Sequence, residues 1–151
     1  MVPMETLKEL ACLKPLSEEQ LDKIGRISTV KTYPKDAYVQ KENDIAASLY
    51  FVTQGRVAIE IDLPKHRKIV IYIVSRGDLF SWSALVPPHL ITAGSLCLEE
   101  TTLVEVPREP LLQLFETDIA LKASMMETVS HVIANRLKDT RLQLGYLLGW
   151  D

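Results

Sequence analysis

The chain has 151 residues, of which 47% are hydrophobic and 25% charged, with a formal net charge of −3. This composition indicates one folded globular domain and excludes an intrinsically disordered chain. The acidic balance argues against direct DNA binding, and no apolar run approaches the roughly 20 residues that span a membrane. The first residues lack the charged and apolar regions of a signal peptide, so we expect a cytoplasmic protein.

Residues 1–26 are predicted to form the N-terminal helices. Apolar side chains at helical spacing predict a first helix over residues 4–11, and Pro15 ends that pattern. Residues 17–20 have the sequence of a capping box, which places the start of a second helix there. Gly25 is expected to end this second helix in the left-handed conformation.

From residue 27 the hydrophobic period changes from that of a helix to that of a strand, and short strands separated by turns continue to residue 107. Residues 69–74 are apolar on both faces, so we expect this strand to be covered on both sides. The pattern predicts a closed or nearly closed barrel or jelly roll. The expected strands are 27–33, 37–41, 49–52, 57–62, 69–74, 93–98 and 103–106.

Helix returns in residues 108–151. A short helix begins at Glu109 and is broken at Thr117 and Asp118, and a last helix runs from about Ile119 to about Leu148. This last helix packs on the barrel as a core-facing helix or forms the seam of a dimer, and the sequence leaves both open. Its apolar stripe consists of Met126, Val129, Ile133, Leu137, Leu144 and Leu147.

Three ordered segments carry a resemblance to a known family. Residues 33–44 resemble a Pro-x-Gly…Gly-Asp segment, with Asp36 and Asn43 in place of glycine, and both residue types tolerate the left-handed conformation. Residues 49–57 resemble Leu-Tyr-Phe-Ile-x-x-Gly-x-Val, and residues 77–80 match Gly-Asp-x-Phe. From about Leu16 to about Leu148, the chain resembles the cyclic nucleotide-binding domain of the Crp/Fnr type. The resemblance implies a mainly β fold, a β-roll of the jelly-roll type with N-terminal helices and a long C-terminal helix.

The departures from the family pattern fall in its phosphate-binding segment. Residues 80–85 align with the family's Phe-Gly-Glu-Leu-Ala-Leu, so Ser81 replaces the glycine and Trp82 replaces the glutamate that binds the ribose 2′-hydroxyl. Ile91 stands where an arginine neutralises the cyclic phosphate. Each lost charge-assisted hydrogen bond costs about 1.5–3 kcal/mol. We therefore expect the binding of cAMP and cGMP to be weakened or lost, although the backbone N–H groups of this segment can still face an anion.

The resemblance places a ligand pocket beside this segment. Trp82 either stacks on a flat ligand or plugs the barrel, and the hydroxyls of Ser81, Ser83 and Thr92 either bind an anion or cap a short helical turn. The candidate ligand-binding residues are Phe80, Ser81, Trp82, Ser83, Ala84, Leu85, Ile91, Thr92 and Ala93.

No catalytic motif and no cofactor site is found in the sequence, so we expect no enzyme. The three histidines lack a shared spacing for a metal or haem, and the two cysteines read as structural thiols. No helix-turn-helix follows the last helix, so direct DNA contacts are not expected. The histidines are His66, His89 and His131, and the cysteines are Cys12 and Cys97.

Three functional hypotheses follow. The first is a stand-alone sensor domain that forms a homodimer through its last helix and binds an unidentified small ligand. The second is a structural or protein-interaction module with a vestigial pocket that is filled by side chains. The third, a catalytic barrel of cupin type, requires inward-facing histidines and a carboxylate, which the predicted strands do not supply.

Overall fold

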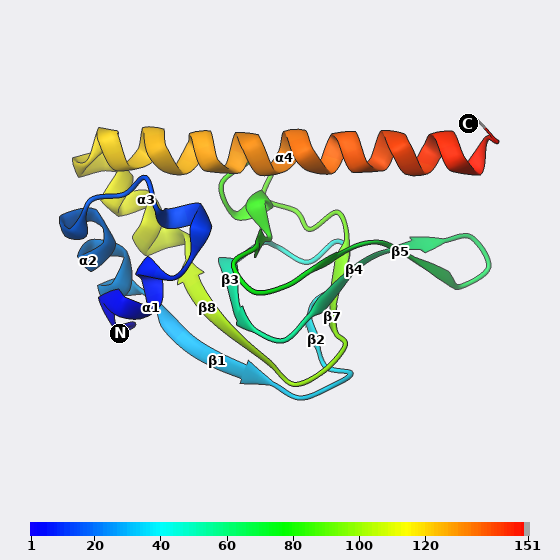
Figure 1. Cartoon of the computed structure of the whole chain (residues 1–151), viewed down its shortest axis with the longest axis horizontal. Coiled ribbons are helices and arrows are strands. Elements are labelled where there is room, and N and C mark those ends of the chain that lie inside the picture. Colours follow the sequence, from blue (N-terminus) through cyan, green and yellow to red (C-terminus); the bar gives the residue numbers. More distant parts are fainter. Residues whose placement is uncertain (150–151) are drawn as a thin grey trace.

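The computed structural model describes residues 1–149. Two four-stranded antiparallel sheets face each other to form a β-roll, with short helices at one end and one long helix lying across the whole molecule (Figure 1). This arrangement confirms the predicted mainly β fold with flanking helices. The first sheet has the strand order β1-β8-β3-β6 and the second the order β2-β7-β4-β5.

The strands are short and close in position to those predicted. In the first sheet they are β1 (Thr29–Tyr33), β8 (Thr101–Pro107), β3 (Ser48–Gln54) and β6 (Leu79–Phe80). In the second sheet they are β2 (Tyr38–Gln40), β7 (Gly94–Cys97), β4 (Val57–Leu63) and β5 (Arg67–Val74). Between them, Asp36 and Asn43 have φ angles of 70° and 72°, so both non-glycine residues adopt the left-handed conformation that the resemblance required.

The N-terminal segment forms three short helices, α1 (Met4–Lys8), η1 (Ala11–Leu13) and α2 (Glu18–Ile27). The first predicted helix is therefore interrupted at Glu9, where the chain turns into a 3₁₀ segment. The capping box of α2 is confirmed, because the Ser17 hydroxyl accepts from the Gln20 N–H at 3.2 Å and the Gln20 side chain accepts from the Ser17 N–H at 3.0 Å.

The expectation that Gly25 ends α2 is wrong, since the helix continues through Ile27. Gly25 is required for a different reason. The N-terminal arm crosses the helix at this point, and the Val2 N–H donates to the Gly25 carbonyl at 2.9 Å. A Cβ atom on Gly25 would lie 2.6 Å from the Val2 carbonyl oxygen. The glycine therefore allows two backbone segments to approach closely.

Strand β3 is buried on both faces. Leu49 and Phe51 point into a core beneath the helices, whereas Tyr50 and Val52 point into the interior of the roll. The prediction of two-sided burial for residues 69–74 is wrong. In β5, Val70 is 48% exposed and Ile73 is 46% exposed, because this strand lies at the edge of its sheet in a hairpin that extends away from the roll (Figure 1).

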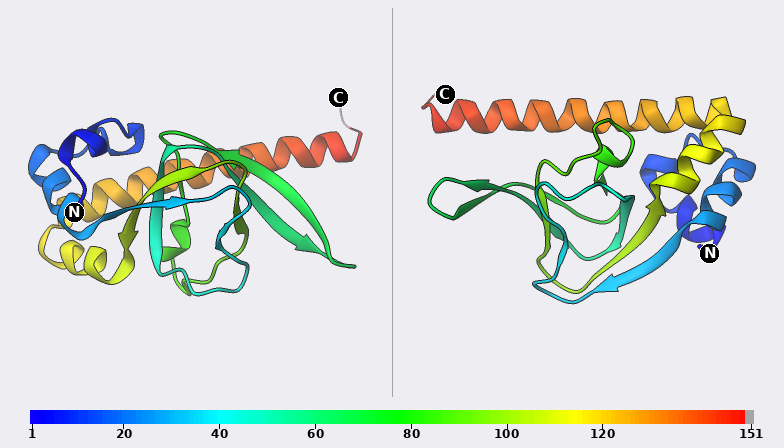
Figure 2. Two further views of the ribbon diagram at one scale, coloured as in Figure 1. Left: turned by 90° about the horizontal axis from the view of Figure 1, so that it is seen from below. Right: turned by 180° about the vertical axis from the view of Figure 1, so that it is seen from behind.

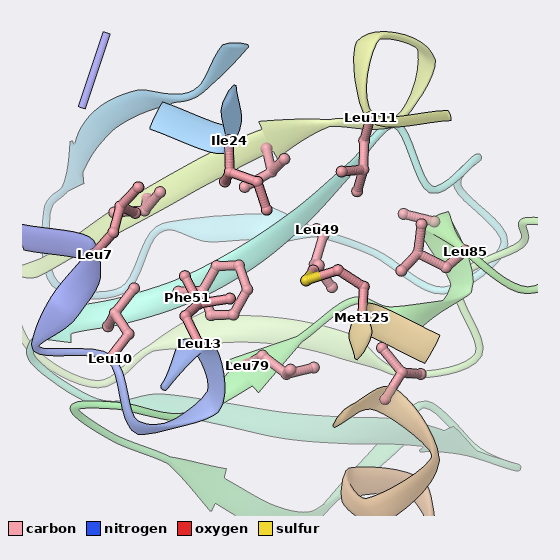
Figure 3. Packing of buried hydrophobic residues seen from close by; sticks show 14 of the residues in the cluster. Leu7, Leu10, Leu13, Ile24, Leu49, Phe51, Leu79, Leu85, Leu111 and Met125 are labelled. Carbon is pink, nitrogen blue, oxygen red and sulfur yellow. The ribbon is translucent and has the colours of Figure 1, made fainter. Parts of the chain in front are cut away.

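The two cores on either side of β3 differ in composition. The larger one is formed by side chains from the N-terminal helices, from β3, β6 and β8, and from the two C-terminal helices (Figure 3). The smaller one fills the roll with residues from both sheets. It consists of Tyr50, Val52, Val57, Ile59, Val74, Phe80, Cys97 and Leu103.

The C-terminal segment forms α3 (Arg108–Thr117) and α4 (Ile119–Leu147), close to the predicted positions. Asp118 begins α4, where one carboxylate oxygen accepts from the Leu121 N–H at 2.9 Å and the other lies 3.1 Å from the Lys23 ammonium of α2. These contacts hold the pKa of the Asp118 carboxyl below its usual range. From this anchor α4 passes over the roll towards the β4–β5 hairpin (Figure 2). No helix within residues 1–149 is both long and apolar enough to cross a membrane.

The close approach at Gly25 predicts the effect of a single methyl group. In an exposed helix interior, Gly→Ala stabilises by about 1 kcal/mol. For Gly25→Ala we expect the opposite sign, a loss of about 1–3 kcal/mol in the free energy of unfolding, because the Val2 carbonyl must move. Urea unfolding measures the difference. Asn135→Ala, at an exposed position of α4, serves as the control with an expected change near zero, and equal stability of Gly25→Ala and wild type would contradict the prediction.

Candidate functional site

The site begins at a tight turn that leads into β6. Gly77 has a φ of 92°, and the Asp78 carboxylate accepts from the Ser75 N–H at 2.9 Å, which closes the turn. Backbone hydrogen bonds between this turn and Val52 then attach the segment to β3. After β6 the chain forms the 3₁₀ turn η2 (Trp82–Ala84) and returns as β7. The segment is therefore a turn, a short strand, a helical turn and a further strand, in that order.

Ser81 joins β6 to η2 in a strained conformation. Its φ of 67° and ψ of 39° are left-handed, a region in which glycine is favoured. The Ser81 hydroxyl donates to the Ser48 carbonyl at 2.7 Å, so the side chain is fixed by the neighbouring strand. The capping role considered for this hydroxyl is absent, because it makes no cap hydrogen bond to η2.

Ile91 is part of the core rather than part of an open binding surface. It is 3% exposed and packs in the larger core. Its backbone is fixed by two hydrogen bonds to the turn that contains Asn43 and Asp44. The Ile91 N–H donates to the Asp44 carbonyl and the Ile91 carbonyl accepts from the Asn43 N–H, both at 2.9 Å. Trp82 is half-buried and packs against the same core. Ile91 and Trp82 therefore both contribute to packing.

A small cavity lies between η2, the start of β7 and the inner face of the second sheet. Its volume is about 30 Å³. Pockets that hold drug-sized ligands have volumes of about 300–1,000 Å³. The lining residues are Gln40, Ile59, Tyr72, Phe80, Ser81, Trp82, Ser83, Ile91, Thr92, Ala93 and Ser95.

Most of the candidate ligand-binding residues lie at this cavity. Ala84 and Leu85 do not line it, because they point into the larger core with exposures of 0% and 6%. Whether the lining residues contact a ligand stays a prediction. Sequence reasoning missed four lining residues, all of them on the second sheet, because only the strand register places them opposite η2. They are Gln40, Ile59, Tyr72 and Ser95.

Tyr72 connects the cavity with the long helix. Its ring lines the cavity, and the guanidinium carbon of Arg136 on α4 lies 4.3 Å from the ring centroid. About two turns further along α4, the Gln143 side chain donates to the Ile71 carbonyl at 2.7 Å. Burial raises the pKa of the Tyr72 phenol to about 12. Two adjacent residues of β5 are therefore in contact with α4.

The stripe of α4 is divided between the core and the surface. Val129 is 1% exposed in the larger core, and Met126 and Ile133 pack against that core, so this half of the stripe faces the chain's own roll. Further along the helix the same stripe is exposed. Leu137, Leu144 and Leu147 have exposures of 49%, 52% and 76%.

The histidines lie apart from one another. The Nδ1 atom of His89 lies 2.8 Å from the Ser83 carbonyl, so it carries the proton and donates there. His131 is exposed beside Glu127, and His66 lies in the turn between β4 and β5. Within the part of the chain that the structure describes, His, Cys, Asp and Glu side chains form no group that could hold a metal ion.

Both cysteines are free thiols. Cys97 is buried in the roll, and Cys12 is half-buried, with its thiol 3.3 Å from the Gly77 carbonyl. Burial raises the pKa of each thiol. Because a thiol with a raised pKa is a poor nucleophile, these contacts fit the structural role expected for both residues.

A β-roll with N-terminal helices, a helical turn over its interior and a long terminal helix defines a class of regulatory domains. Residues 30–118 match the family model of the cyclic nucleotide-binding domain, and the chain belongs to that family. It is similar over 91% of its length to a protein of Geobacter metallireducens described as cyclic nucleotide-binding, with 26% identity, 99% of that chain covered and a TM-score of 0.81.

Two longer regulators share the fold. The Thermus thermophilus catabolite activator protein has 21% identity and a TM-score of 0.74, and the match covers 90% of this chain but 62% of that one. The c-di-GMP-responsive regulator CLP of Xanthomonas campestris has 22% identity and a TM-score of 0.77, with 89% and 66% covered. The resemblance to the Crp/Fnr type is thus confirmed at the level of the fold.

The geometry of Ser81 predicts different effects for two small substitutions. Ser81→Ala keeps a Cβ atom in the left-handed conformation and removes the hydrogen bond to Ser48, so we expect it to destabilise the fold. Ser81→Gly also removes the hydrogen bond but relieves the strain, which is worth about 1–2 kcal/mol. In chemical denaturation the glycine variant should therefore be more stable than the alanine variant. The reverse order would show that backbone strain at Ser81 is negligible.

Proposed function

We propose that this chain is a regulatory sensor domain of the Crp/Fnr type in which the binding of cAMP and cGMP is weakened or lost. The observation that carries the proposal is the burial of Ile91 in the core, at the position where the family places a phosphate-binding arginine. A neutral side chain cannot offset the charge of a cyclic phosphate. Trp82 likewise offers no acceptor to a ribose hydroxyl, because the indole carries a donor only.

The energetic consequence is large. Two charge-assisted hydrogen bonds of about 1.5–3 kcal/mol each amount to about 3–6 kcal/mol, or roughly a hundredfold to ten-thousandfold in affinity. The Ala84 N–H of η2 already donates to the Ser81 carbonyl at 3.1 Å, which leaves the N–H groups of Trp82 and Ser83 as donors to an anion. They supply no net charge, and they do not form the charge-assisted bonds of a guanidinium.

The size of the cavity supports a second candidate function. A volume of about 30 Å³ is close to that of one water molecule and far below that of a nucleotide pocket. The chain is then a structural or protein-interaction module whose vestigial pocket is filled by Trp82, Tyr72 and Ile91. The two candidates differ in one observable, which is whether any small molecule raises the melting temperature.

The exposed half of α4 supports homodimer formation through that helix. Leu137 and Leu144 are seven residues apart and Leu147 follows at a three-residue step, which is the spacing of a coiled-coil seam. All three side chains are exposed in the single chain, unlike Val129 in the other half of the helix. A second copy of this chain would cover these leucines.

The nucleotide proposal predicts no response to cAMP. A ligand with a Kd of 10 µM would stabilise the fold by about 2.7 kcal/mol at 1 mM, which raises the melting temperature of a domain of this size by several degrees. For the wild type with 1 mM cAMP or cGMP we expect a shift below one degree in a thermal-shift assay. A shift of several degrees would overturn the proposal.

A gain-of-function variant sharpens this test. Trp82→Glu combined with Ile91→Arg restores both charges of the family pattern, and we expect it to bind cAMP at least ten times more tightly than the wild type. Trp82→Gln combined with Ile91→Met makes comparable changes in size without charge and is the matched control. Equal cAMP affinity of the two double variants, measured by calorimetry, would show that the missing charges do not limit binding.

The dimer proposal is tested by mass in solution. We expect the wild type to sediment as a dimer at micromolar concentration and Leu144→Glu combined with Leu147→Glu to sediment as a monomer, because two charges enter an apolar seam. Lys138→Glu changes charge at an exposed polar position of the same helix and should leave the dimer intact. A monomeric wild type would contradict the proposal.

A further inference from the structure

The floor of the cavity is a single row of side chains across the second sheet. Gln40 on β2 pairs with Ser95 on β7, Ser95 pairs with Ile59 on β4, and Ile59 pairs with Tyr72 on β5. All four residues line the cavity. The roof is η2 with Trp82, so the cavity lies between a sheet and a helical turn that come from distant parts of the chain.

Ser95 carries a buried hydroxyl that residues 1–149 leave without a hydrogen-bond partner. The residue is 1% exposed. Buried hydroxyls are normally paired, and an unpaired one lowers the stability of the fold. The Ser95 hydroxyl therefore identifies a point in the cavity wall where an occupant can supply the missing partner.

The cavity wall lacks formal charge. Its lining, all of it within the described part of the chain, contains no Lys, Arg, His, Asp or Glu side chain. The Tyr72 phenol is neutral at pH 7, as an ordinary tyrosine is, and burial raises its pKa further, to about 12. The polar groups that remain are the Gln40 amide and the serine and threonine hydroxyls. Arg136 contacts the Tyr72 ring but does not line the cavity, so a charged occupant would lose its hydration without gaining a direct counter-charge. An uncharged occupant avoids that cost.

We infer that this cavity binds a small uncharged molecule with a hydrogen-bonding group, such as a primary amide, whose polar group pairs with the Ser95 hydroxyl and whose apolar part lies against Trp82. This inference rests on the proposed function, because it names the ligand class of the same site. This inference goes beyond weak cyclic-nucleotide binding. It states that a cavity without charged side chains selects neutral molecules over charged ones. A volume of about 30 Å³ holds about one water molecule, so a primary amide of several heavy atoms enters only when Trp82 moves.

The test uses acetamide and acetate, which have nearly the same shape and differ in charge. Each is titrated into the ¹⁵N-labelled full chain, and NMR follows the amide signals of Ser95 and Thr92. We expect acetamide to shift these signals in a saturable manner and acetate at the same concentration to leave them unchanged. Equal shifts with both compounds, stronger shifts with acetate, or no saturable shift with acetamide would each overturn the inference.

A serine variant then tests the role of Ser95. We expect Ser95→Ala to weaken acetamide binding by about fivefold to tenfold, the effect of one hydrogen bond. Without ligand, this variant should melt at or above the wild-type temperature because an unpaired hydroxyl has been removed. Ser130→Ala, on the exposed face of α4, should bind acetamide as the wild type does. Unchanged affinity in Ser95→Ala, or a lower melting temperature without ligand, would overturn the role assigned to Ser95.

Failure of this inference can be separated from failure of the proposed function. If neither cAMP nor acetamide binds, the weakened nucleotide site stands and the neutral-ligand inference is overturned. If cAMP binds the wild type with micromolar affinity, the proposed function fails whatever acetamide does.

Discussion

The burial of β3 on both faces is the constraint on which the rest of the structure depends. Alternate side chains of this strand enter two different cores, Leu49 and Phe51 beneath the helices and Tyr50 and Val52 inside the roll. The ring of Tyr50 also stacks on Phe80 of β6 at a centroid distance of 5.2 Å. β6 leads directly into η2, so the position of the helical turn over the cavity is set by its attachment to the most deeply buried strand. A shift of β3 would disturb the helical layer and the roof of the cavity together.

On the proposed function, this site keeps the family fold while its chemistry changes. Ser81 adopts a left-handed conformation, and Ile91 and Trp82 pack in or against the larger core. Burying an isoleucine contributes about 1.5–3 kcal/mol to stability. Under this proposal, the fold gains packing at the position where the family's binding site holds an arginine.

Local sequence signals predicted the features that depend on a few neighbouring residues. The capping box at Ser17, the left-handed turns at Asp36 and Asn43 and the length of α4 follow from short-range rules, and the structure has them. The features that failed depend on what approaches from elsewhere. Gly25 faces the N-terminal arm, and β5 is exposed although its own sequence indicates a strand covered on both faces.

The lining residues on the second sheet could not be predicted either, because their position also depends on distant parts of the chain. Ser95 and Tyr72 reach it through strand register, and β5 has a bulge next to Tyr72. Tyr72 lies opposite Ile59 and Val70 lies opposite Glu60, which leaves Ile71 as an extra residue. An insertion of one residue in the ladder changes which face the following side chains occupy. A count of alternating residues along the sequence cannot detect it, although hydroxyls and an amide on strands that are otherwise apolar hint at an inward polar cluster.

Helix α4 is attached to the rest of the chain at two distant points, so a small rotation about one point produces a large displacement at the other. Asp118 fixes its start to α2, and Gln143 fixes it to the bulged residue Ile71 beside the cavity. The helical rise of 1.5 Å per residue places these two points about 37 Å apart. A tilt of about 5° around the first anchor would carry the far end through about 3 Å. A change in the packing of Tyr72 against Arg136 that tilted the helix would therefore move its far end more than the part next to Asp118.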